Sequence, residues 1–211
     1  MSRGLGDVYK RQVGYFTSTN IKSSYRRGLE IEAGYQLNSK FNLSGNLTIS
    51  ENKVDSFTQF IDNWDTWGQE MVLHENTDLA FSPNMIWAAQ ADYKLNSKTT
   101  ILFNSKYVGE QFIDNTSNTE RMLDAYLISN LQIDYVFNSF LFKKAKFSFL
   151  INNLFDVEYV NNAWLYRYIT NSFDPTESDI YTTLGSDGVY DMAGYFPQAK
   201  RNYLLGLTID F

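Results

Sequence analysis

The chain ends in "RNYLLGLTIDF" (residues 201–211), where apolar and polar residues alternate up to the last position. The intervening residues are polar or small except Leu204. Such period-2 alternation predicts a β-strand with one face turned away from water. A chain terminus usually frays and tolerates almost any sequence, so strict alternation to the final residue needs a cause. The alternating apolar residues are Tyr203, Leu205, Leu207, Ile209 and Phe211.

The same alternation recurs along the chain from residue 13 onwards, while helical periodicity is nearly absent. Together with the terminal stretch, the alternating segments predict an all-β, antiparallel fold of about eight strands. The other segments are "VGYFTSTN" (13–20), "GLEIEAGYQL" (28–37), "FNLSGNLTIS" (41–50), "MIWAAQADYKL" (85–95), "TILFNSKY" (100–107), "AYLISNLQIDY" (125–135) and "KFSFLINN" (146–153).

The connections between these segments alternate between short and long. Residues 37–40, 96–98 and 138–144 are short turns rich in Asn, Ser and Lys, whereas 53–82, 109–121 and 154–198 are long, with a shorter one near 20–27. Two unlike ends are typical of outer-membrane barrels, whose periplasmic turns are short and whose extracellular loops are long. A soluble β-sandwich is the alternative, because it would also show alternation.

Aromatic residues favour the membrane barrel over the sandwich. They make up 17% of the chain, and amphipathic rings prefer the headgroup level of a bilayer. Six rings on the apolar faces lie next to a short turn or at the chain end, which predicts the periplasmic girdle. Strands of about ten residues also match a tilted crossing. The six rings are Tyr35, Phe41, Tyr93, Tyr135, Phe147 and Phe211.

Composition excludes several classes of function. The net charge of -6, a pI near 4.8 and the lack of a Lys/Arg cluster argue against nucleic-acid binding. With no Cys, neither a disulfide nor a thiolate metal site can form. A single histidine in a loop gives no catalytic constellation, so we expect no enzyme, no cofactor and no bound metal.

The first twelve residues look unrelated to the rest of the chain. "RGLGDVYKRQ" (3–12) resembles the read-through of sequencing-adapter DNA at the end of a metagenomic reading frame. We therefore expect residues 1–12 to be non-native, residues 13–211 to be the C-terminal portion of a barrel, and the true N-terminus to lie upstream.

Three stretches in order resemble the C-terminal part of a TonB-dependent outer-membrane receptor of Bacteroidetes-like bacteria. They are "YRRGLEIEAGY" (25–35), "INNLFDVEYVNN" (151–162) and "YFPQAKRNYLLGLTIDF" (195–211). The first is similar to an R-G-x-E strand opening and the second to an N-L-F-D-x-x-Y segment. In the third, a Pro and an Arg precede the closing strand, and that strand resembles the signal read by the barrel assembly machinery.

The resemblance implies a 22-stranded barrel with a plug domain inside it. This chain would be its last eight strands and would form an open sheet, because both edges lack their neighbours. The implied protein binds a scarce substrate (a ferric siderophore, cobalamin or a glycan) and imports it with energy from TonB. Its partners would be outer-membrane lipid, the assembly machinery, the small-molecule substrate and, through upstream segments, the TonB complex. A complete eight-stranded barrel with a structural or adhesive role and a barrel enzyme are the alternatives.

Ligand capture is expected in the loops 53–82 and 154–198, because loops carry function on such scaffolds. Planar rings suit siderophores and sugars; the alternative is that these rings pack the loops against each other. The acidic run at 174–179 offers oxygen ligands for Ca²⁺ but lacks a known loop spacing, so a solvated loop is expected there. The candidate ligand residues are Trp64, Trp67, His74, Trp164, Tyr166, Tyr168, Tyr181, Tyr190 and Tyr195.

Polar residues on the opposite strand faces are expected to line the lumen. They would either hydrogen-bond to the plug domain or form a solvated wall. They are Glu30, Glu32, Gln90, Asp92, Asn104, Lys106, Asn130, Gln132, Asp134 and Asn152.

Overall fold

The structure is a computed structural model that describes residues 6–10, 16–139 and 142–210. Its ordered elements are strands and one short 3₁₀ helix, and within the described ranges no helix is long and apolar enough to cross a membrane. The elements are β1 (Gly6–Lys10), β2 (Phe16–Asn20), β3 (Ser24–Asn38), β4 (Phe41–Asn63), β5 (Gly68–Asp78), β6 (Met85–Lys94), β7 (Thr99–Val108), β8 (Gln111–Phe112), β9 (Met122–Leu123), β10 (Tyr126–Ser139), β11 (Phe142–Asn152), β12 (Val160–Ile169), η1 (Pro175–Glu177), β13 (Thr182–Leu184), β14 (Tyr190–Pro197) and β15 (Asn202–Asp210).

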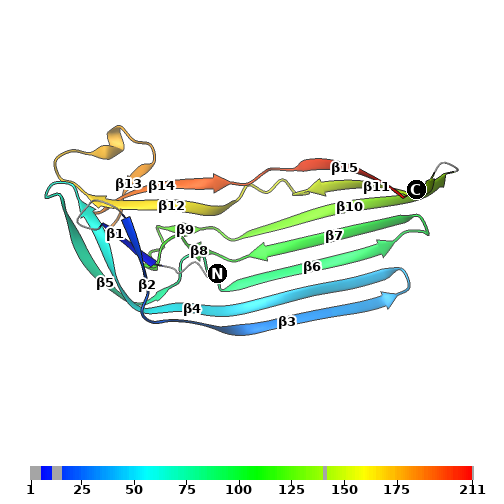
Figure 1. Ribbon diagram of the computed structural model, residues 1–211, viewed down its shortest axis with the longest axis horizontal. Helices are drawn as coiled ribbons and strands as arrows, with labels where there is room; N and C mark the ends of the chain where they lie inside the picture. Colours follow the sequence, from blue (N-terminus) through cyan, green and yellow to red (C-terminus); the bar gives the residue numbers. More distant parts are fainter. Residues whose placement is uncertain (1–5, 11–15, 140–141, 211) are drawn as a thin grey trace.

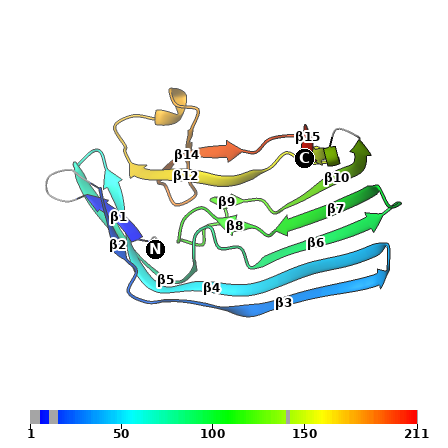
Figure 2. The same cartoon turned by 45° about the vertical axis from the view of Figure 1, so that its right-hand side comes forward.

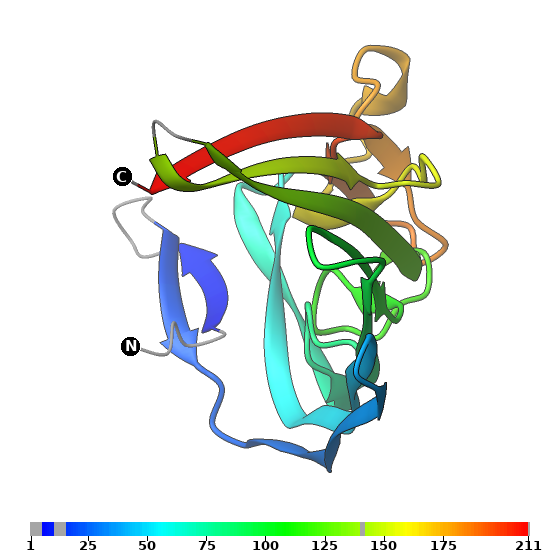
Figure 3. The ribbon, with the colours of Figure 1, turned by 90° about the vertical axis from the view of Figure 1, so that its right-hand side faces the viewer.

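Seven of these strands form an antiparallel meander in the order β3-β4-β6-β7-β10-β11-β15, here called the spanning sheet. Its short turns all lie at one end, on the right in Figure 1, and its long connections at the other, here called the loop end. Seen from the short-turn end, the sheet curls into an open arc from β3 to β15 (Figure 3). The up-and-down arrangement with two unlike ends is therefore confirmed.

The register joins the apolar positions of all seven strands into rows. Leu131 on β10 lies opposite Phe103 on β7 and Ile151 on β11. Large apolar side chains on this face stay exposed, which suits contact with lipid tails and would be a hazard in water. The alternation thus correctly placed these residues together on one face of the sheet; that this face meets lipid stays a prediction. One complete row reads Tyr35, Leu43, Ala91, Phe103, Leu131, Ile151 and Tyr203.

The opposite face of the spanning sheet carries the polar residues expected in the lumen. Asn130 donates a hydrogen bond to Asn104 (2.9 Å), and Gln132 donates to Asp134 (2.9 Å), which also faces Lys146 at 3.7 Å. Neighbouring charges and amides on this face are therefore paired with each other. Leu102, Leu150 and Leu204 share this face with them, so the inner wall is not uniformly polar.

The segments expected as long loops are largely β-structure. Residues 53–82 contain the second half of β4 and its hairpin partner β5, and residues 154–198 contain β12, β13 and β14. Within these segments β4, β12 and β14 carry buried residues whereas β5 is mostly exposed, and their short, irregular runs of alternation hid these strands in the sequence. These strands form what we call the loop-end sheet, in the order β5-β4-β12-β14-β13.

The first expected strand, 13–20, is also different. Its described part, β2, pairs with β1 in a separate two-stranded sheet and does not extend the spanning sheet. Among the described residues, β15 pairs only with β11, so no ladder closes the sheet into a small barrel. The open sheet is confirmed and the complete eight-stranded barrel is not. Phe211 lies outside the described residues.

The stretch "NLFDVEY" (153–159) forms a hinge between β11 and β12. Asn153 and Asp156 have positive φ (50° and 57°), a backbone conformation that Asn and Asp tolerate better than most residues. The buried Asn153 amide donates to the carbonyl oxygens of Val157 (2.8 Å) and Ala199 (3.3 Å), and its oxygen accepts from Val157 N (2.9 Å). The hinge thereby fixes where β12 leaves β11 and where β15 begins.

Candidate functional site

The loop-end sheet joins two hairpins that are far apart in the sequence. β12 lies parallel to the tip of β4, where Tyr168 and Ile169 face Asp62 and Asn63. Trp64 N donates to the Ile169 carbonyl (2.9 Å), and the Asp65 carboxylate accepts from Ser172 Oγ (2.6 Å). We call this contact the seam. It brings residues 62–65 and 168–172 together over the end of the spanning sheet (Figure 2).

Asp65 holds the outer end of the seam. Besides Ser172 Oγ, its carboxylate accepts from Asn171 N (2.7 Å) and Thr170 Oγ1 (3.1 Å). These hydrogen bonds stabilise the ionised form and lower the pKa of Asp65 to about 2. The carboxylate therefore stays charged and bonded at any physiological pH.

Two buried arginines lie beneath the seam. Arg167 on β12 donates to Asp191 on β14 (2.6 Å) and to Asp187 in the turn before it (2.5 Å). Arg121, from the segment between β7 and β10, donates to Asp191 (3.1 Å) and Asp114 (2.8 Å). We call these five residues the charge cluster. Buried charges persist only when they are paired and hydrogen-bonded, so the cluster joins the segment between β7 and β10 to β12 and β14.

Ion pairing sets the protonation of the charge cluster. Burial lowers the pKa of Arg167, but the hydrogen bonds and charges of Asp191 and Asp187 outweigh it and raise that pKa above its ordinary value. Burial likewise raises the pKa of Asp187, and the Arg167 guanidinium more than offsets this and lowers it. Both groups therefore stay ionised.

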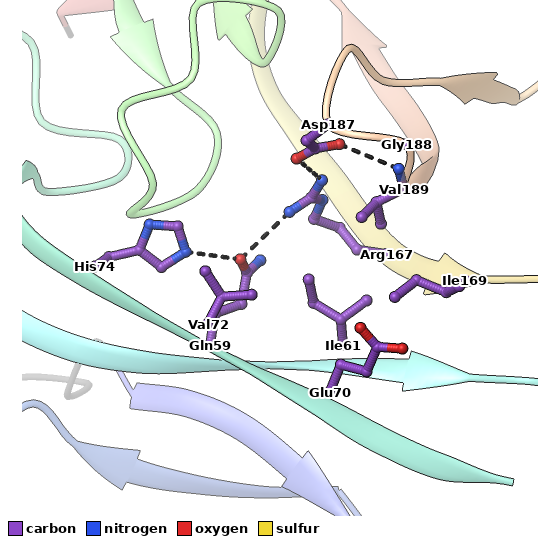
Figure 4. Close-up of a pocket in the computed structure, with 10 residues that line it drawn as sticks. All are labelled: Gln59, Ile61, Glu70, Val72, His74, Arg167, Ile169, Asp187, Gly188 and Val189. Carbon is purple, nitrogen blue, oxygen red and sulfur yellow. Dashed lines mark hydrogen bonds and ion pairs between the residues drawn. The ribbon is translucent and has the colours of Figure 1, made fainter. Parts of the chain in front are cut away.

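Gln59 links the charge cluster to His74. Its side-chain oxygen lies 3.3 Å from Arg167 Nη1 and 3.0 Å from His74 Nε2 (Figure 4). Because a guanidinium can only donate, the Gln59 atom facing it is the oxygen, and His74 Nε2 must carry a proton. His74 also stacks on Phe57, with ring centroids 5.0 Å apart. Burial lowers the pKa of His74, so the ring is neutral at pH 7.

A pocket of about 280 Å³ opens across the seam between β4–β5 and β12 (Figure 4). Its lining combines aliphatic walls with the polar groups just described. Arg167 and Ile61 are buried in its floor, whereas Glu70 and Asp187 are exposed. The lining residues are Gln59, Ile61, Glu70, Val72, His74, Arg167, Ile169, Asp187, Gly188 and Val189.

Four of the predicted ligand aromatics form a stack on the other face of β12. Trp64 stacks on Tyr168 with centroids 4.1 Å apart, and Tyr168 continues to Tyr190 (5.6 Å) and Tyr166 (5.6 Å). Tyr168 is only 1% exposed. Tyr166 donates to Asp62 (2.7 Å); its burial, together with this carboxylate, raises its pKa to about 12. In these four residues the rings pack the hairpins against each other.

The remaining predicted residues are placed apart from the stack. Trp67 sits at the tip of the β4–β5 hairpin, where it is 94% exposed with a φ of 60°. Trp164 lies opposite Gly194, and its ring occupies the space that a side chain there would need. Tyr181 and Tyr195 are exposed elsewhere, and only His74 lines the pocket. A ligand role for these nine residues stays a prediction.

The two arginines were not among the residues predicted from the sequence. One signal was present: in "AWLYRYIT" (163–170), Arg167 occupies the alternating position between Leu165 and Ile169, on a face that is otherwise apolar. A charged residue in such an apolar series indicates either a buried ion pair or a binding site. Arg121 had no comparable signal. Within the described residues, no group of three His, Cys, Asp or Glu could hold a metal ion.

A model of the family "TonB dependent receptor-like, beta-barrel" matches residues 3–154, more than half of the chain. The chain belongs to this family. Comparison with curated proteins finds no match. The resemblance seen in "YRRGLEIEAGY" (25–35) falls inside the matched range, and the terminal strand follows it.

Solved structures show the same fold. The siderophore receptor PiuA from Acinetobacter baumannii matches with a TM-score of 0.59 at 14% identity, over 87% of this chain and 21% of its own. The ferric-catecholate import receptor Fiu from E. coli K12, closed form, gives 0.54 at 15%, over 98% and 23%. The unliganded ferric citrate transporter FecA gives 0.53 at 19%, over 87% and 24%. The chain therefore spans about a fifth to a quarter of each of these receptors.

Proposed function

We propose that this chain is the C-terminal barrel portion of a transport receptor in the outer membrane of a Gram-negative bacterium. The receptor binds a scarce small molecule at the cell surface and imports it with energy supplied by TonB. The observation that carries the proposal is the register of the spanning sheet, which joins apolar rows across seven strands and leaves both edges open for further strands. Family membership and the pocket at the loop end support it.

The substrate proposed first is an iron chelate, with cobalamin and glycans as alternatives. The names of the similar solved receptors, which bind siderophores, ferric catecholates or ferric citrate, favour this order. These are also receptors and transporters, which supports a role without catalysis. We propose the loop-end sheet as this chain's contribution to substrate capture, because it carries the pocket and the exposed Trp67.

The remaining partners follow from the two faces and the end of the chain. The apolar rows would contact outer-membrane lipid, and the polar face would contact the plug or solvent. β15, with Tyr203, Leu205, Leu207 and Ile209 on its outer face, is proposed as the segment that the assembly machinery reads. TonB would act through segments upstream of this chain.

Excising each loop-end hairpin from the complete receptor tests the proposal. Ser56 lies opposite Glu75, so replacing residues 56–75 by a two-residue turn keeps the Lys53–Asp78 and Val54–Thr77 pairs. Replacing 165–193 keeps the Trp164–Gly194 pair. We expect both variants to assemble in the membrane and to lose uptake of a panel of ferric siderophores, cobalamin and oligosaccharides. Unchanged uptake in both would place capture in the plug or the upstream loops.

A further inference from the structure

The size of the pocket limits what it can hold. About 280 Å³ corresponds to roughly nine water molecules at about 30 Å³ each. This volume lies at the lower end for small-molecule sites. The pocket therefore fits one head group of a substrate, not an entire chelate. Its walls are aliphatic, from Ile61, Val72, Ile169 and Val189, and His74 is the one ring among the described residues that line it.

The arginine that lines the pocket is already paired. Arg167 donates through Nε to Asp191, through Nη2 to Asp187 and through Nη1 to Gln59. Arg121, in the same charge cluster, donates to Asp114, Asp191 and Thr116. Because Asp187 and Asp191 already neutralise Arg167, an anionic ligand would compete with these carboxylates for it, and breaking a buried pair is costly.

The charge around the pocket is negative. Two guanidinium groups, of Arg121 and Arg167, face the carboxylates of Asp114, Asp187 and Asp191, and Glu70 adds a fourth. Carboxylates thus exceed cations by two over the charge cluster with Glu70, and by one among the lining residues alone, where Glu70 and Asp187 accompany Arg167. His74 adds no charge because burial lowers its pKa. In a partly desolvated site, an excess of this kind attracts a cation far more strongly than it would in water.

Two of these carboxylates are open to a ligand. Asp187 has 40% of its side chain exposed, and Glu70 is exposed on β5, whereas Asp191 is buried between the arginines. Glu70 and Asp187 come from the two sides of the seam and flank the aliphatic walls (Figure 4). One carboxylate oxygen of Glu70 accepts a hydrogen bond from the Asn63 side-chain amide (2.8 Å). The other carboxylate oxygen has no partner among the described residues.

We propose that this pocket binds a protonated aliphatic amine carried by the substrate, with Glu70 and Asp187 as its carboxylate partners and the aliphatic walls around its methylene groups. The inference rests on the proposed function, since it specifies the chemistry of the substrate that the receptor captures. The Gln59 amide NH₂, whose oxygen is fixed towards Arg167, supplies a neutral donor for an adjacent carbonyl or hydroxyl. Because the groups come from both hairpins, such a ligand would bridge the seam.

The test uses the complete receptor containing this chain, in detergent, and three probes of one size: butylamine, butan-1-ol and butyrate. Saturation-transfer NMR titrations give their Kd values. We expect the amine to bind about tenfold more tightly than the alcohol, as one charge-assisted contact allows, and butyrate to bind weakest. Butyrate binding as tightly as butylamine would overturn the proposal.

Two matched variants locate the contact. Glu70→Gln keeps an oxygen for Asn63 and removes the charge, and we expect it to raise the Kd of butylamine about tenfold without changing that of butan-1-ol. Glu75→Gln removes a charge from the same strand outside the pocket and should change neither Kd. Equal effects of the two substitutions would contradict the site.

Uptake separates this inference from the proposed function. A receptor that imports a member of the substrate panel but shows no amine preference refutes the inference and leaves the transport function standing. A receptor that shows the amine preference and imports nothing from the panel refutes the proposed function and supports the pocket chemistry.

Discussion

The spanning sheet and the loop-end sheet are stabilised in different ways. In the spanning sheet, each strand pairs with the next strand of that sheet along the chain over eight or more residues, and large apolar side chains remain exposed on one face. In the loop-end sheet, β4 meets β12 over only two residue pairs, more than 100 positions apart in sequence. Buried ion pairs and an aromatic stack supply the stability that this short ladder lacks.

Under the proposed placement in the outer membrane, the difference follows from the solvent around each sheet. A bilayer offers no hydrogen bonds, so the spanning backbone must pair completely and the outer face must stay apolar. Above the membrane, water competes for every polar group, and a contact between distant hairpins persists only where side chains exclude that water. The stability of the loop-end sheet therefore depends more on specific side chains, whereas that of the spanning sheet depends more on the alternation of apolar and polar residues.

The sharpest test of the loop-end sheet is Asp191→Ala. This buried carboxylate bridges Arg121 and Arg167, and removing it leaves two buried cations short of a partner. We expect the free energy of opening of β12 and β14 to fall by about 3–5 kcal/mol, as for other broken buried pairs. Hydrogen exchange of their amides in the receptor, reconstituted in lipid vesicles, measures it.

Glu177→Ala is the control for that substitution. Glu177 is an exposed carboxylate in the same connection, in η1, so its removal changes the net charge equally. Exchange in the spanning strands should be unchanged in both variants. If the two substitutions had the same small effect, the charge cluster would not be what stabilises the loop-end sheet.

The spanning sheet is tested by charge at neighbouring positions on β10. Leu131→Lys places a cation in the middle of an apolar row, and we expect a loss of about 2–4 kcal/mol in the free energy of folding into a bilayer. Gln132→Lys, one residue further and on the inner face, should cost much less. Urea titrations in lipid vesicles compare the two, and equal or reversed costs would mean that the faces are assigned wrongly.

Sequence alone predicted the seven strands of the spanning sheet, and wrongly added the segment 13–20 to them. A period of two fixes which residues share a face, and a short turn fixes that the two strands it joins are neighbours, so Leu131 and Ile151 could be placed on one face before their pairing was known. Two of the six rings expected in the girdle are neighbours near the short turns: Phe41 packs edge-on against Tyr93, with centroids 6.2 Å apart. The girdle itself stays a prediction.

The loop-end sheet was only partly predictable. Alternation marks a strand but does not say that β12 will meet β4, because that contact depends on the bend at Asn153 and on partners such as Asp191 for Arg167. For Trp64 and Tyr168 the sequence left both ligand contact and loop packing open, and in the structure the two rings stack on each other. Aromatic composition could not distinguish rings that pack together from rings that face a ligand, since both are planar and apolar.

The hinge between the two sheets is tested at Asn153. Asn153→Ala removes three side-chain hydrogen bonds and puts an alanine at a φ of 50°, so we expect a loss of about 1–3 kcal/mol, from unpaired backbone groups and left-handed strain. Asn153→Gly removes the same bonds without the strain. Thermal unfolding of both variants separates these two causes, and a wild-type Tm for both would mean that the hinge does not depend on this side chain.

The smallest expected effect is a pH dependence confined to the loop-end sheet. Burial lowers the pKa of His74 from 6.5, and the charges that face it from neighbouring elements are Asp114, Asp187, Arg121 and Arg167. A base whose pKa is lower in the folded state binds its proton more readily after opening. The stabilisation by neutral His74 is therefore complete above pH 6.5 and is lost as the pH falls from there through the folded-state pKa. Hydrogen exchange of β5 amides, corrected for intrinsic rates, should accelerate over that range.

The control variant is His74→Gln, which retains a donor for Gln59 and should abolish the acceleration. The amides of β7 should show no acceleration in either protein. Acceleration that persists in His74→Gln would assign the titration to another group of the site.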